Sequence, residues 1–414
     1  MNTKRSMMLL IAAAAVLSAA GCGKKEQEVT VESEPEPAVT VSSTGKKIGI
    51  SFPDADLLRW QKDAAYFTEE FKSKGYDVTV SYAGNDAAQQ KTDISGLLSN
   101  GCDLLIVAPV DADALGSVMT QAGSSGIPVI SYDELILNTP VLSAYVGFDE
   151  SGAGKMTADY VIDRLGLKEG DTSKEYTAEY AACTVGDSPV GYVYNGIYDE
   201  LSSYISTDVL LTLSGESTFS EALTEGEIAA VSESEPDQLA AAQEAEETAV
   251  LDVQKTQQKR LEKILSSAYG NTQLNALLCT DEVSSCAAAS ALNSYSGKND
   301  VILAGVGVNE AVLANLVDGK QSAAVFEPTD ELRPVTVSLA VSILLGESPD
   351  ETLLEKNSWG DECRYDTGSY DNGSGVVAAY LVEPVLITAD TITSKLVDTG
   401  YYTMDGKYPE EAVN

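Results

Sequence analysis

The polar side chains best suited to hold a small ligand stand directly after short apolar runs of the sequence. Most are carboxylates, which, like amides, can hydrogen-bond two neighbouring hydroxyl groups of one ligand. If the apolar runs are parallel strands, their carboxyl ends meet at one edge of a sheet, where such sheets bind ligands. The residues at these positions are Asp54, Asp133, Asp149, Asp187, Asp281, Asn309 and Glu327.

The chain contains no histidine. This excludes Ser-His-Asp and Cys-His nucleophiles, histidine-ligated zinc and imidazole proton transfer. A hydrolase could still use two carboxylates, but the spacing of the acids selects no pair. Residues 152–155 lack the full spacing of a phosphate-binding loop and are typical of a helix start. Composition therefore favours a binding protein over an enzyme, and no cofactor is expected.

A Gly/Ser-rich loop near the C-terminus contains Asp366, Asp371 and Asn372. These oxygen-bearing side chains could hold calcium, but turn formation explains them equally well. We therefore assign no metal site from the sequence.

The size and charge of the chain limit its class further. Its 414 residues are too many for one compact domain and suffice for two or three. With 44% hydrophobic and 22% charged residues, it can form a globular core. The 64 acidic and 26 basic residues give a net charge of −38. Such a surface repels phosphate backbones, so nucleic acid is not an expected partner.

The N-terminus has the pattern of an export signal. Residues 1–21 combine Lys4 and Arg5 with an apolar run and small residues, as in a signal peptide. Cys22 follows Ala-Gly, which resembles the lipobox of bacterial lipoproteins, where this cysteine carries the lipid. The alternative is an ordinary cleaved signal with an incidental cysteine. Residues 22–45, rich in Glu, Pro and Ser, predict a disordered tether. We expect a body anchored by lipid at the outer face of the bacterial cytoplasmic membrane.

Beyond Gly45, predicted strands and amphipathic helices alternate along the chain. Strands are predicted at residues 47–52, 78–80, 104–107 and 127–132, and later at 180–185, 209–213, 274–279, 301–306 and 323–326. The later helices include residues 249–268 and 284–295. This α/β pattern, repeated twice, predicts two doubly wound parallel-sheet lobes with a cleft between them.

Residues 216–247 interrupt the alternation with ten acidic residues and no basic one. An acidic arm that contacts a partner is one interpretation of this insertion. A solvated insertion, part helix and part loop, is favoured on general grounds.

Five cysteines remain beyond Cys22, so at least one thiol of the monomer must stay unpaired. Cys183 and Cys279 lie in apolar strand-like runs, and we expect them to act as small buried hydrophobic residues.

Residues 47–53 followed by Arg59-Trp60 resemble the first strand and loop of bacterial sugar-binding proteins of ABC transporters. The likeness is greatest to the xylose-binding and multiple-sugar-binding proteins, and it extends from about Lys46 to Tyr402 without the insertion. Further matching segments, in order, are residues 126–133, 148–149, 186–189, 278–281, 324–326, 370–373 and 380–385. The resemblance implies a type I periplasmic-binding-protein fold, in which three hinge crossovers join two lobes that close on the ligand.

The resemblance also implies how the lobes divide the chain. The N-terminal lobe is expected to comprise residues 46–149 and about 308–346, and the C-terminal lobe residues 150–307 and about 347–414. The crossovers are accordingly expected near Asp149, near Gly307 and after Gly346. The implied function is capture of a monosaccharide-like solute outside the cytoplasm and delivery to the membrane permease of an ABC transporter. A ligand sensor that docks on a membrane receptor remains an alternative.

The family uses polar contacts at the positions of Arg59, Asp133, Asp149 and Asp281. An apolar face for a sugar ring could come from aromatic side chains, namely Phe52, Trp60, Tyr192 and Tyr194. Trp60 also fits core packing, and Asp281 also fits a helix N-cap. With the positions that depart from the family included, the predicted ligand-binding residues are Arg59, Trp60, Asp133, Glu134, Asp149, Asp281, Asn309 and Glu327.

The departures concern charge. Glu134 and Glu327 stand where the family commonly has Arg and Lys, Glu150 where it has Asn, and Asn309 where it has Asp. Buried carboxylates without a counter-charge are costly unless their pKa values rise or a cation enters. A neutral aldose is favoured, and a cationic ligand such as an amino sugar or another amine is the alternative. Arg333 on the next helix is a candidate ion-pair partner for Glu327.

Overall fold

The computed structural model describes residues 44–55, 57–185, 189–226, 236–297, 300–359, 362–403 and 406–407. The predicted signal peptide, Cys22 and nearly all of the predicted tether lie outside these residues, as does Asp187. None of the helices in the described ranges is both long and apolar enough to span a membrane.

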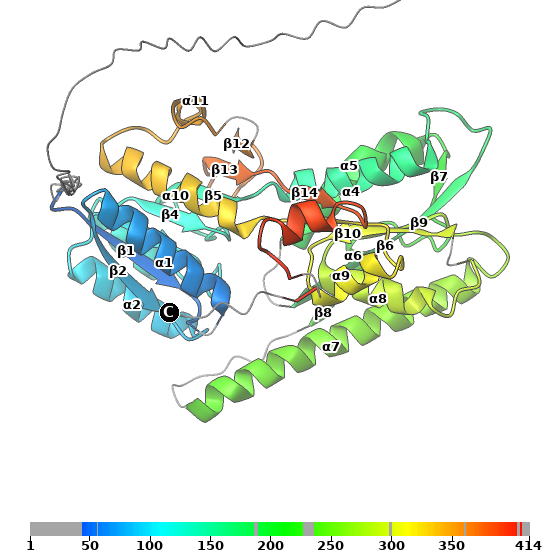
Figure 1. Cartoon of the computed structure of the whole chain (residues 1–414), viewed down its shortest axis with the longest axis horizontal. Helices are drawn as coiled ribbons and strands as arrows, with labels where there is room; N and C mark the ends of the chain where they lie inside the picture. The colour runs from blue at the N-terminus through cyan, green and yellow to red at the C-terminus, as the bar shows by residue number, and fades with distance from the viewer. Residues whose placement is uncertain are drawn as a thin grey trace, which may run out of the picture. The chain divides into compact units, whose positions relative to one another are not determined.

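The first lobe is built on a sheet with the strand order β12-β13-β5-β4-β3-β1-β2, parallel except for β12. Its strands are β1 Lys47–Phe52, β2 Asp77–Tyr82, β3 Leu104–Val107, β4 Val129–Tyr132, β5 Leu142–Phe148, β12 Cys363–Asp366 and β13 Ala379–Val382. Its helices are α1 Leu58–Ser73, α2 Ala87–Ser99, α3 Gly116–Ser124, α10 Thr329–Leu344 and α11 Thr352–Lys356. One apolar core joins α1 and α10 to the sheet, and a second joins α2 and α3 to it. The sheet is thus covered on both faces, as a doubly wound sheet requires (Figure 1).

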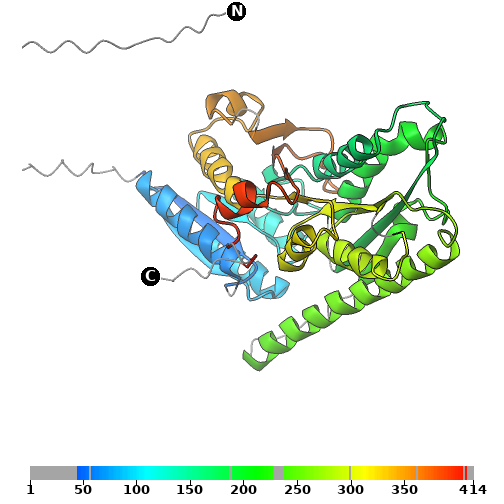
Figure 2. The same cartoon turned by 45° about the vertical axis from the view of Figure 1, so that its right-hand side comes forward.

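The second lobe is built on a sheet with the order β14-β11-β10-β9-β6-β7, and β8 also pairs with β6. Its strands are β6 Tyr176–Val185, β7 Leu210–Leu211, β8 Leu223–Gly226, β9 Ala276–Cys279, β10 Ile302–Val306, β11 Ala323–Phe326 and β14 Val385–Ile387. Its helices are α4 Glu150–Leu165, α5 Val190–Ser206, α6 Phe219–Ala222, α7 Pro236–Ser267, α8 Glu282–Leu292, α9 Glu310–Val317 and a π-helical turn, Thr393–Val397. Separate cores pack α4 and α5, and α7 and α8, against it (Figure 2). The predicted two-lobe α/β architecture is confirmed.

The chain crosses between the two sheets three times. The first crossing follows β5 at Asp149, as expected. The second lies at residues 327–328, between β11 and α10, and the third at residues 383–384, between β13 and β14. The crossover expected near Gly307 was therefore misplaced, and the third lies after Gly346 as expected but well beyond residue 347, where the second lobe was expected to resume.

Strand pairing explains both corrections. Residues 308–326 belong to the second lobe because the unit β10-α9-β11 places β11 parallel to β10 in the same sheet. Residues 347–382 belong to the first lobe because β13 is buried on both faces and pairs in parallel with β5. Periodicity identified β11 but could not tell which sheet it joins.

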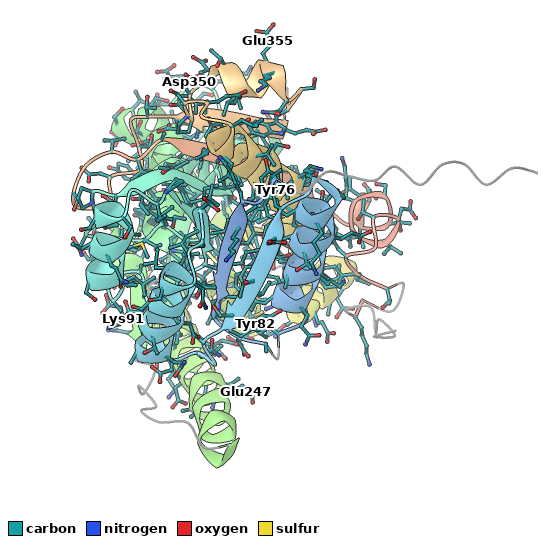
Figure 3. The ribbon with its side chains drawn as sticks, turned by 90° about the vertical axis from the view of Figure 1, so that its left-hand side faces the viewer. Tyr76, Tyr82, Lys91, Glu247, Asp350 and Glu355 are labelled. Carbon is teal, nitrogen blue, oxygen red and sulfur yellow. The ribbon has the colours of Figure 1, made fainter. Side chains whose placement is uncertain are left out.

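The acidic insertion is partly integrated into the second lobe. Its first part forms α6 and β8, and β8 adds a parallel strand beside β6. Gln257 on α7 secures this strand, since its fully buried amide donates to the carbonyls of Ala182 and Ala222. Helix α7 starts at Pro236, within the insertion, and is longer than the predicted 249–268. Glu247 on α7 is exposed, as is Glu355 on α11 (Figure 3).

The five cysteines of the described chain are free thiols, and all are buried. Cys183 and Cys279 lie in β6 and β9, as the apolar runs predicted. Burial raises the pKa of the Cys102 and Cys286 thiols to about 11, so these groups are neutral and unreactive at neutral pH.

Two glycines let α4 and α5 pack backbone to backbone beside the cleft. A Cβ on Gly154 would lie 2.0 Å from the carbonyl oxygen of Val193, and one on Gly196 would lie 2.0 Å from that of Ser151. Residues 152–155 are indeed helical, as predicted. The close approach matters because α4 begins at the first crossing and α5 provides a wall of the cavity described below.

We predict that Gly154→Ala and Gly196→Ala each destabilise the fold, by about 1–3 kcal/mol or more, because the added methyl must displace backbone. The matched control is Gly96→Ala in α2, where a Cβ meets no atom within 4 Å. Here the same change should leave stability equal or raise it by about 0.4–1 kcal/mol. Thermal denaturation of the unliganded chain measures all three. Equal effects at the three sites would contradict the close helix contact.

Candidate functional site

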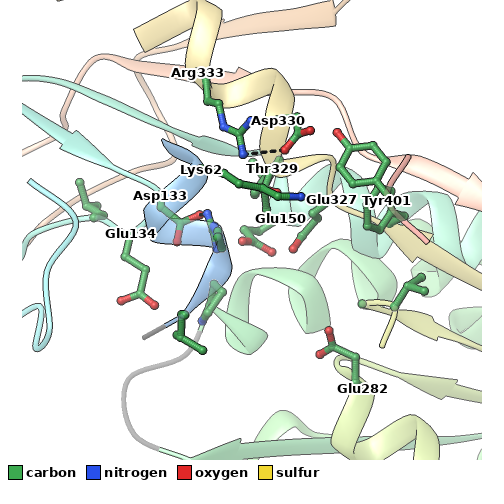
Figure 4. Close-up of a pocket in the computed structure, with 18 of the residues that line it drawn as sticks. Lys62, Asp133, Glu134, Glu150, Glu282, Glu327, Thr329, Asp330, Arg333 and Tyr401 are labelled. Carbon is green, nitrogen blue, oxygen red and sulfur yellow. Dashed lines mark hydrogen bonds and ion pairs between the residues drawn. The ribbon is translucent and has the colours of Figure 1, made fainter. Parts of the chain in front are cut away.

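A cavity of about 730 Å³ lies between the lobes, at the carboxyl ends of strands from both sheets. Arg59 and Asp133 line it from the first lobe, and Glu150, Tyr192 and Glu327 from the second. Figure 4 shows the acidic side chains of this cavity and the neighbouring Lys62 and Arg333. A site whose walls come from both lobes is the arrangement that closure on a ligand needs.

Four of the eight predicted residues line the cavity, namely Arg59, Asp133, Glu134 and Glu327. The other four do not, namely Trp60, Asp149, Asp281 and Asn309. They lie close to the lining residues in sequence but have other contacts, and these contacts show how the cavity is held together.

Arg59 and Asp133 form an ion pair inside the cavity. Arg59 is in the first turn of α1, and Asp133 follows β4 with a φ of 71°. Burial alone lowers the pKa of the Arg59 guanidinium, but Asp133 raises it, and the net shift is upward. The Nε of Arg59 is buried and has no hydrogen-bond partner among the described residues. The Arg59 side chain as a whole is 31% exposed and lines the cavity, so its guanidinium is within reach of a ligand.

The ring of Trp60 packs against the guanidinium of Arg59. The guanidinium lies 4.5 Å from the centre of the Trp60 ring, which stacks on Phe52 at 5.1 Å. Trp60 is only 7% exposed and Phe52 fully buried, so neither offers a face to a ligand. Of the two interpretations of Trp60, the structure supports core packing, with a cation–π contact that helps orient Arg59.

Glu150 and Glu327 meet where the first two crossings run past each other (Figure 4). A hydrogen bond joins their carboxyl groups, which requires a proton on one of them. Burial and the adjacent Glu327 raise the pKa of Glu150 well above its ordinary value. Burial raises the pKa of Glu327 to about 7, although the hydrogen bond from Glu150 lowers it. Glu150 is thus the donor in this hydrogen bond and Glu327 the acceptor.

Arg333 does not pair with Glu327, the partner suggested from the sequence. Its Nε donates to Asp63 at 2.5 Å, and its Nη2 lies 2.8 Å from Asp330. Asp63 is fully buried and also accepts from the hydroxyl of Tyr132 at 2.9 Å. This network ties α10 to α1 and holds Tyr132, the residue before Asp133, in place.

Glu282 is a further acid of the cavity wall. It lies against Gly307, where a Cβ would approach the carboxyl carbon of Glu282 to 2.2 Å. Gly307 also has a φ of 82°, so a larger residue would be both strained and obstructed there. Burial, with smaller contributions from the charges of Asp281 and Glu327, raises the pKa of Glu282 to about 7, although its own backbone N–H lowers it.

Asp149 holds the first crossing in place. It accepts a hydrogen bond from the backbone N–H of Gly152 and thereby caps α4. Both carboxylate oxygens contact Arg364 of β12, at 2.7 and 3.0 Å. Because Arg364 satisfies its charge, Asp149 is a structural anchor beside the cavity. Sequence reasoning missed Arg364, which is more than 200 positions away along the chain.

Asp281 and Asn309 are helix caps, one of the two roles foreseen for Asp281. Asp281 accepts from the N–H of Ser284 at 2.7 Å and from the N–H of Cys183 at 2.9 Å, which links β6 to α8. Asn309 accepts from the N–H of Val312 at 2.9 Å. Burial raises the pKa of Asp281, whereas these hydrogen bonds lower it. Neither side chain reaches the cavity.

Aromatic side chains surround the acids. Of the predicted aromatic contacts, only Tyr192 lines the cavity, where it stacks on Tyr370 of the other lobe at 5.3 Å. Tyr194 is buried in the second lobe instead. The lining residues that sequence reasoning did not select include Lys62, Glu282, Tyr370 and Tyr401. Glu282 neighbours the predicted Asp281, but periodicity does not tell which of two adjacent acids points into the cavity.

In the Gly/Ser-rich loop near the C-terminus, the polar side chains that were candidates for calcium stabilise turns. Asp366 accepts from the N–H groups of Gly368 and Ser369, both at 2.8 Å, and Asp371 accepts from that of Gly373. The amide of Asn372 donates to the carbonyls of the 136–139 segment. In the described ranges no group of three or more acids or cysteines is arranged to hold a metal ion.

Comparison with known proteins agrees with this geometry. Residues 48–348 match the periplasmic binding protein domain family. The multiple sugar-binding periplasmic protein SbpA of Azospirillum brasilense is 28% identical over 88% of this chain and 92% of its own length. The D-xylose-binding periplasmic protein of Haemophilus influenzae is 24% identical over 87% of this chain and 92% of its own length.

A solved ABC transporter solute-binding protein from Clostridium phytofermentans, with bound β-D-glucose, is also similar. It is 32% identical, with a TM-score of 0.64, and the match covers 87% of this chain and 99% of the other. The family match runs through β1 to β11 and therefore through both walls of the cavity. The chain belongs to the periplasmic binding protein domain family.

Proposed function

We propose that this protein is an extracytoplasmic solute-binding protein that captures a monosaccharide-like ligand between its two lobes and delivers it to an ABC transporter permease. The observation that carries the proposal is the cavity itself. Its walls come from both lobes, and in the described ranges the backbone passes between them at three short crossings. A ligand that contacts both walls binds the closed state better and therefore shifts the equilibrium toward closure.

The relatives support the ligand class. Two of them are named as multiple sugar-binding and D-xylose-binding periplasmic proteins, and the match spans over nine-tenths of each. The Clostridium phytofermentans protein, at 32% identity, has β-D-glucose bound. A monosaccharide also suits the size of the cavity, which falls within the usual range for small-ligand sites.

We propose that Arg59 and Asp133 are the principal polar contacts from the first lobe and Glu150 and Glu327 those from the second. Tyr192 is proposed to offer its ring to the apolar side of the ligand. In this scheme Trp60, Asp149, Asp281 and Asn309 position the contacting residues or their helices and do not touch the ligand. Glu134 lies at the more exposed rim of the cavity.

The proposed partners follow from the same function. Lipid attachment at Cys22, after removal of residues 1–21, would keep the protein close to the permease on the outer face of the membrane. No chemical step is proposed, since the relatives are solute-binding proteins. A membrane receptor in place of the permease is the alternative. Uptake of the solute into vesicles that contain a candidate permease would distinguish the two, because a protein that only docks on a receptor would support no uptake.

We predict that a monosaccharide raises the melting temperature of the full chain in a thermal-shift screen, since binding to the folded state stabilises it. Arg59→Gln should weaken that binding about tenfold or more, because a charged hydrogen-bond donor is removed from a partly buried site. Arg164→Gln, at an exposed position near the end of α4, is the charge-matched control and should bind normally. If both variants bind alike, Arg59 is not a ligand contact.

We predict a pH-dependent effect of Glu327→Gln on the unliganded chain. Because burial raises the pKa of Glu327 to about 7, the folded chain binds this proton more tightly than the unfolded chain. The resulting stabilisation is complete below the unfolded pKa, at about pH 4, and disappears as the pH rises through 7. The variant lacks the titration, so its melting temperature should exceed that of the wild type by about 2–4 °C or more at pH 8.

At about pH 4, where Glu327 is protonated in both states, the same variant should show little or no gain. Differential scanning fluorimetry at the two pH values checks this, with Glu355→Gln as an exposed control of equal charge change. An identical gain for Glu327→Gln at both pH values would contradict a buried, proton-binding carboxyl.

A further inference from the structure

The walls of the cavity carry more negative than positive side chains. The acidic lining residues are Asp133, Glu134, Glu150, Glu282, Glu327 and Asp330. The basic lining residues are Arg59, Lys62 and Arg333. Arg59 pairs with Asp133, and Arg333 pairs with Asp330 and with Asp63 in the core. With six acids and three bases, the lining has an excess of acidic groups.

The excess is concentrated where Glu150 and Glu327 meet. Glu150 is only 6% exposed, and Oε1 of Glu327 is buried without a hydrogen-bond partner among the described residues. Glu282, on the opposite wall, contributes to the same field, since its charge and that of Glu327 act on one another. In Figure 4 the carboxyl groups of Glu150 and Glu327 point toward each other and that of Glu282 lies across the cavity.

Such a group of carboxyls is costly to ionise without a counter-charge. In the unliganded chain the proton that Glu150 and Glu327 share supplies this counter-charge. A neutral hydroxyl can donate to Oε1 of Glu327, but it supplies no charge and leaves the pair protonated. A cation supplies both a donor and the missing charge, so both carboxyls can ionise and bind it with charge-assisted hydrogen bonds.

The aromatic lining fits the same kind of ligand. The hydroxyls of Tyr145, Tyr370 and Tyr402 donate to the carbonyls of Asp133, Phe148 and Val308, at 2.9, 3.1 and 2.7 Å. These phenols are thus committed to the backbone, and the half-buried rings of Tyr192 and Tyr401 are the ones that the lining offers to a ligand. Aromatic faces attract a cation through their quadrupole and also pack on the C–H face of a ring.

We propose that the solute carries a positive charge, an ammonium group on a sugar-like ring, and that this group binds between Glu150 and Glu327. The inference rests on the proposed function and names the ligand class within it. On binding, the ammonium takes the place of the shared proton, which is released to solvent, and the ring lies among the tyrosines.

Isothermal titration calorimetry of the full chain with matched sugars tests this. The probes are D-glucosamine, D-galactosamine and D-mannosamine, each beside the neutral parent hexose, at pH 7. We expect at least one amino sugar to bind about tenfold or more tightly than its parent, as for a hydrogen bond between charged groups. Its affinity should also rise between pH 5.5 and pH 7, while the amine stays protonated, because Glu327, whose pKa burial raises to about 7, begins to lose its proton over this range.

Variants separate the pair from the general acidity of the chain. Glu327→Gln should reduce the affinity for the amino sugar about tenfold or more and leave that for the parent hexose equal or higher. Glu355→Gln removes one negative charge from the exposed α11 and should change neither.

The outcomes distinguish the two proposals. A neutral hexose that binds as tightly as or more tightly than its amino counterpart would overturn the cationic ligand and leave the solute-binding function intact. Binding of an amino sugar that Glu327→Gln does not weaken would overturn the assignment of the pair. Binding of no sugar from either series would contradict the proposed function as well.

Discussion

The cavity depends on three crossings that the two sheets hold together. β5 and β13 are neighbours in the first sheet, and β11 and β14 are neighbours in the second, so the strands that flank the crossings are paired within their own sheets. Arg364, on the strand next to β13, clamps Asp149 at the first crossing. As a result, Glu150 and Glu327 are brought face to face and lose most of their contact with water. Their unusual protonation follows from this chain path.

The acids around the cleft divide into two groups according to what satisfies their charge. Asp149 has a guanidinium, and Asp281 has backbone N–H groups. These residues support the walls and do not line the cavity. Glu150 and Glu327 bond to each other and Glu282 to its own backbone N–H, and burial raises the pKa of each. Acids that the fold leaves unsatisfied are the ones available to a ligand, which is why the choice of ligand is chiefly an electrostatic question.

Much of the fold could be predicted because strands buried on both faces are continuous apolar runs. β1, β3 and β11 appear with their observed bounds in the sequence pattern. The strands that were not predicted are β5, β8, β12, β13 and β14. β12 and β14 are short and only partly buried, whereas β5 and β13 were missed although they are largely buried. The division into lobes failed for the same stretch of chain, since the order of strands within a sheet is a long-range property that local periodicity does not contain.

The sequence alone determined the α/β class, the two lobes and the acidic character of the strand ends, because these depend on residue type and on repeat along the chain. It also placed Arg59, Asp133 and Glu327 among the candidates. Only the tertiary structure decided that Trp60 lies under Arg59, that Arg364 satisfies Asp149, and that Glu150 and Glu327 share a proton. The last two are contacts between residues that come together through strand order and chain crossings, and the first depends on the packing of Trp60 on Phe52. The charge that a side chain retains is set by such neighbours.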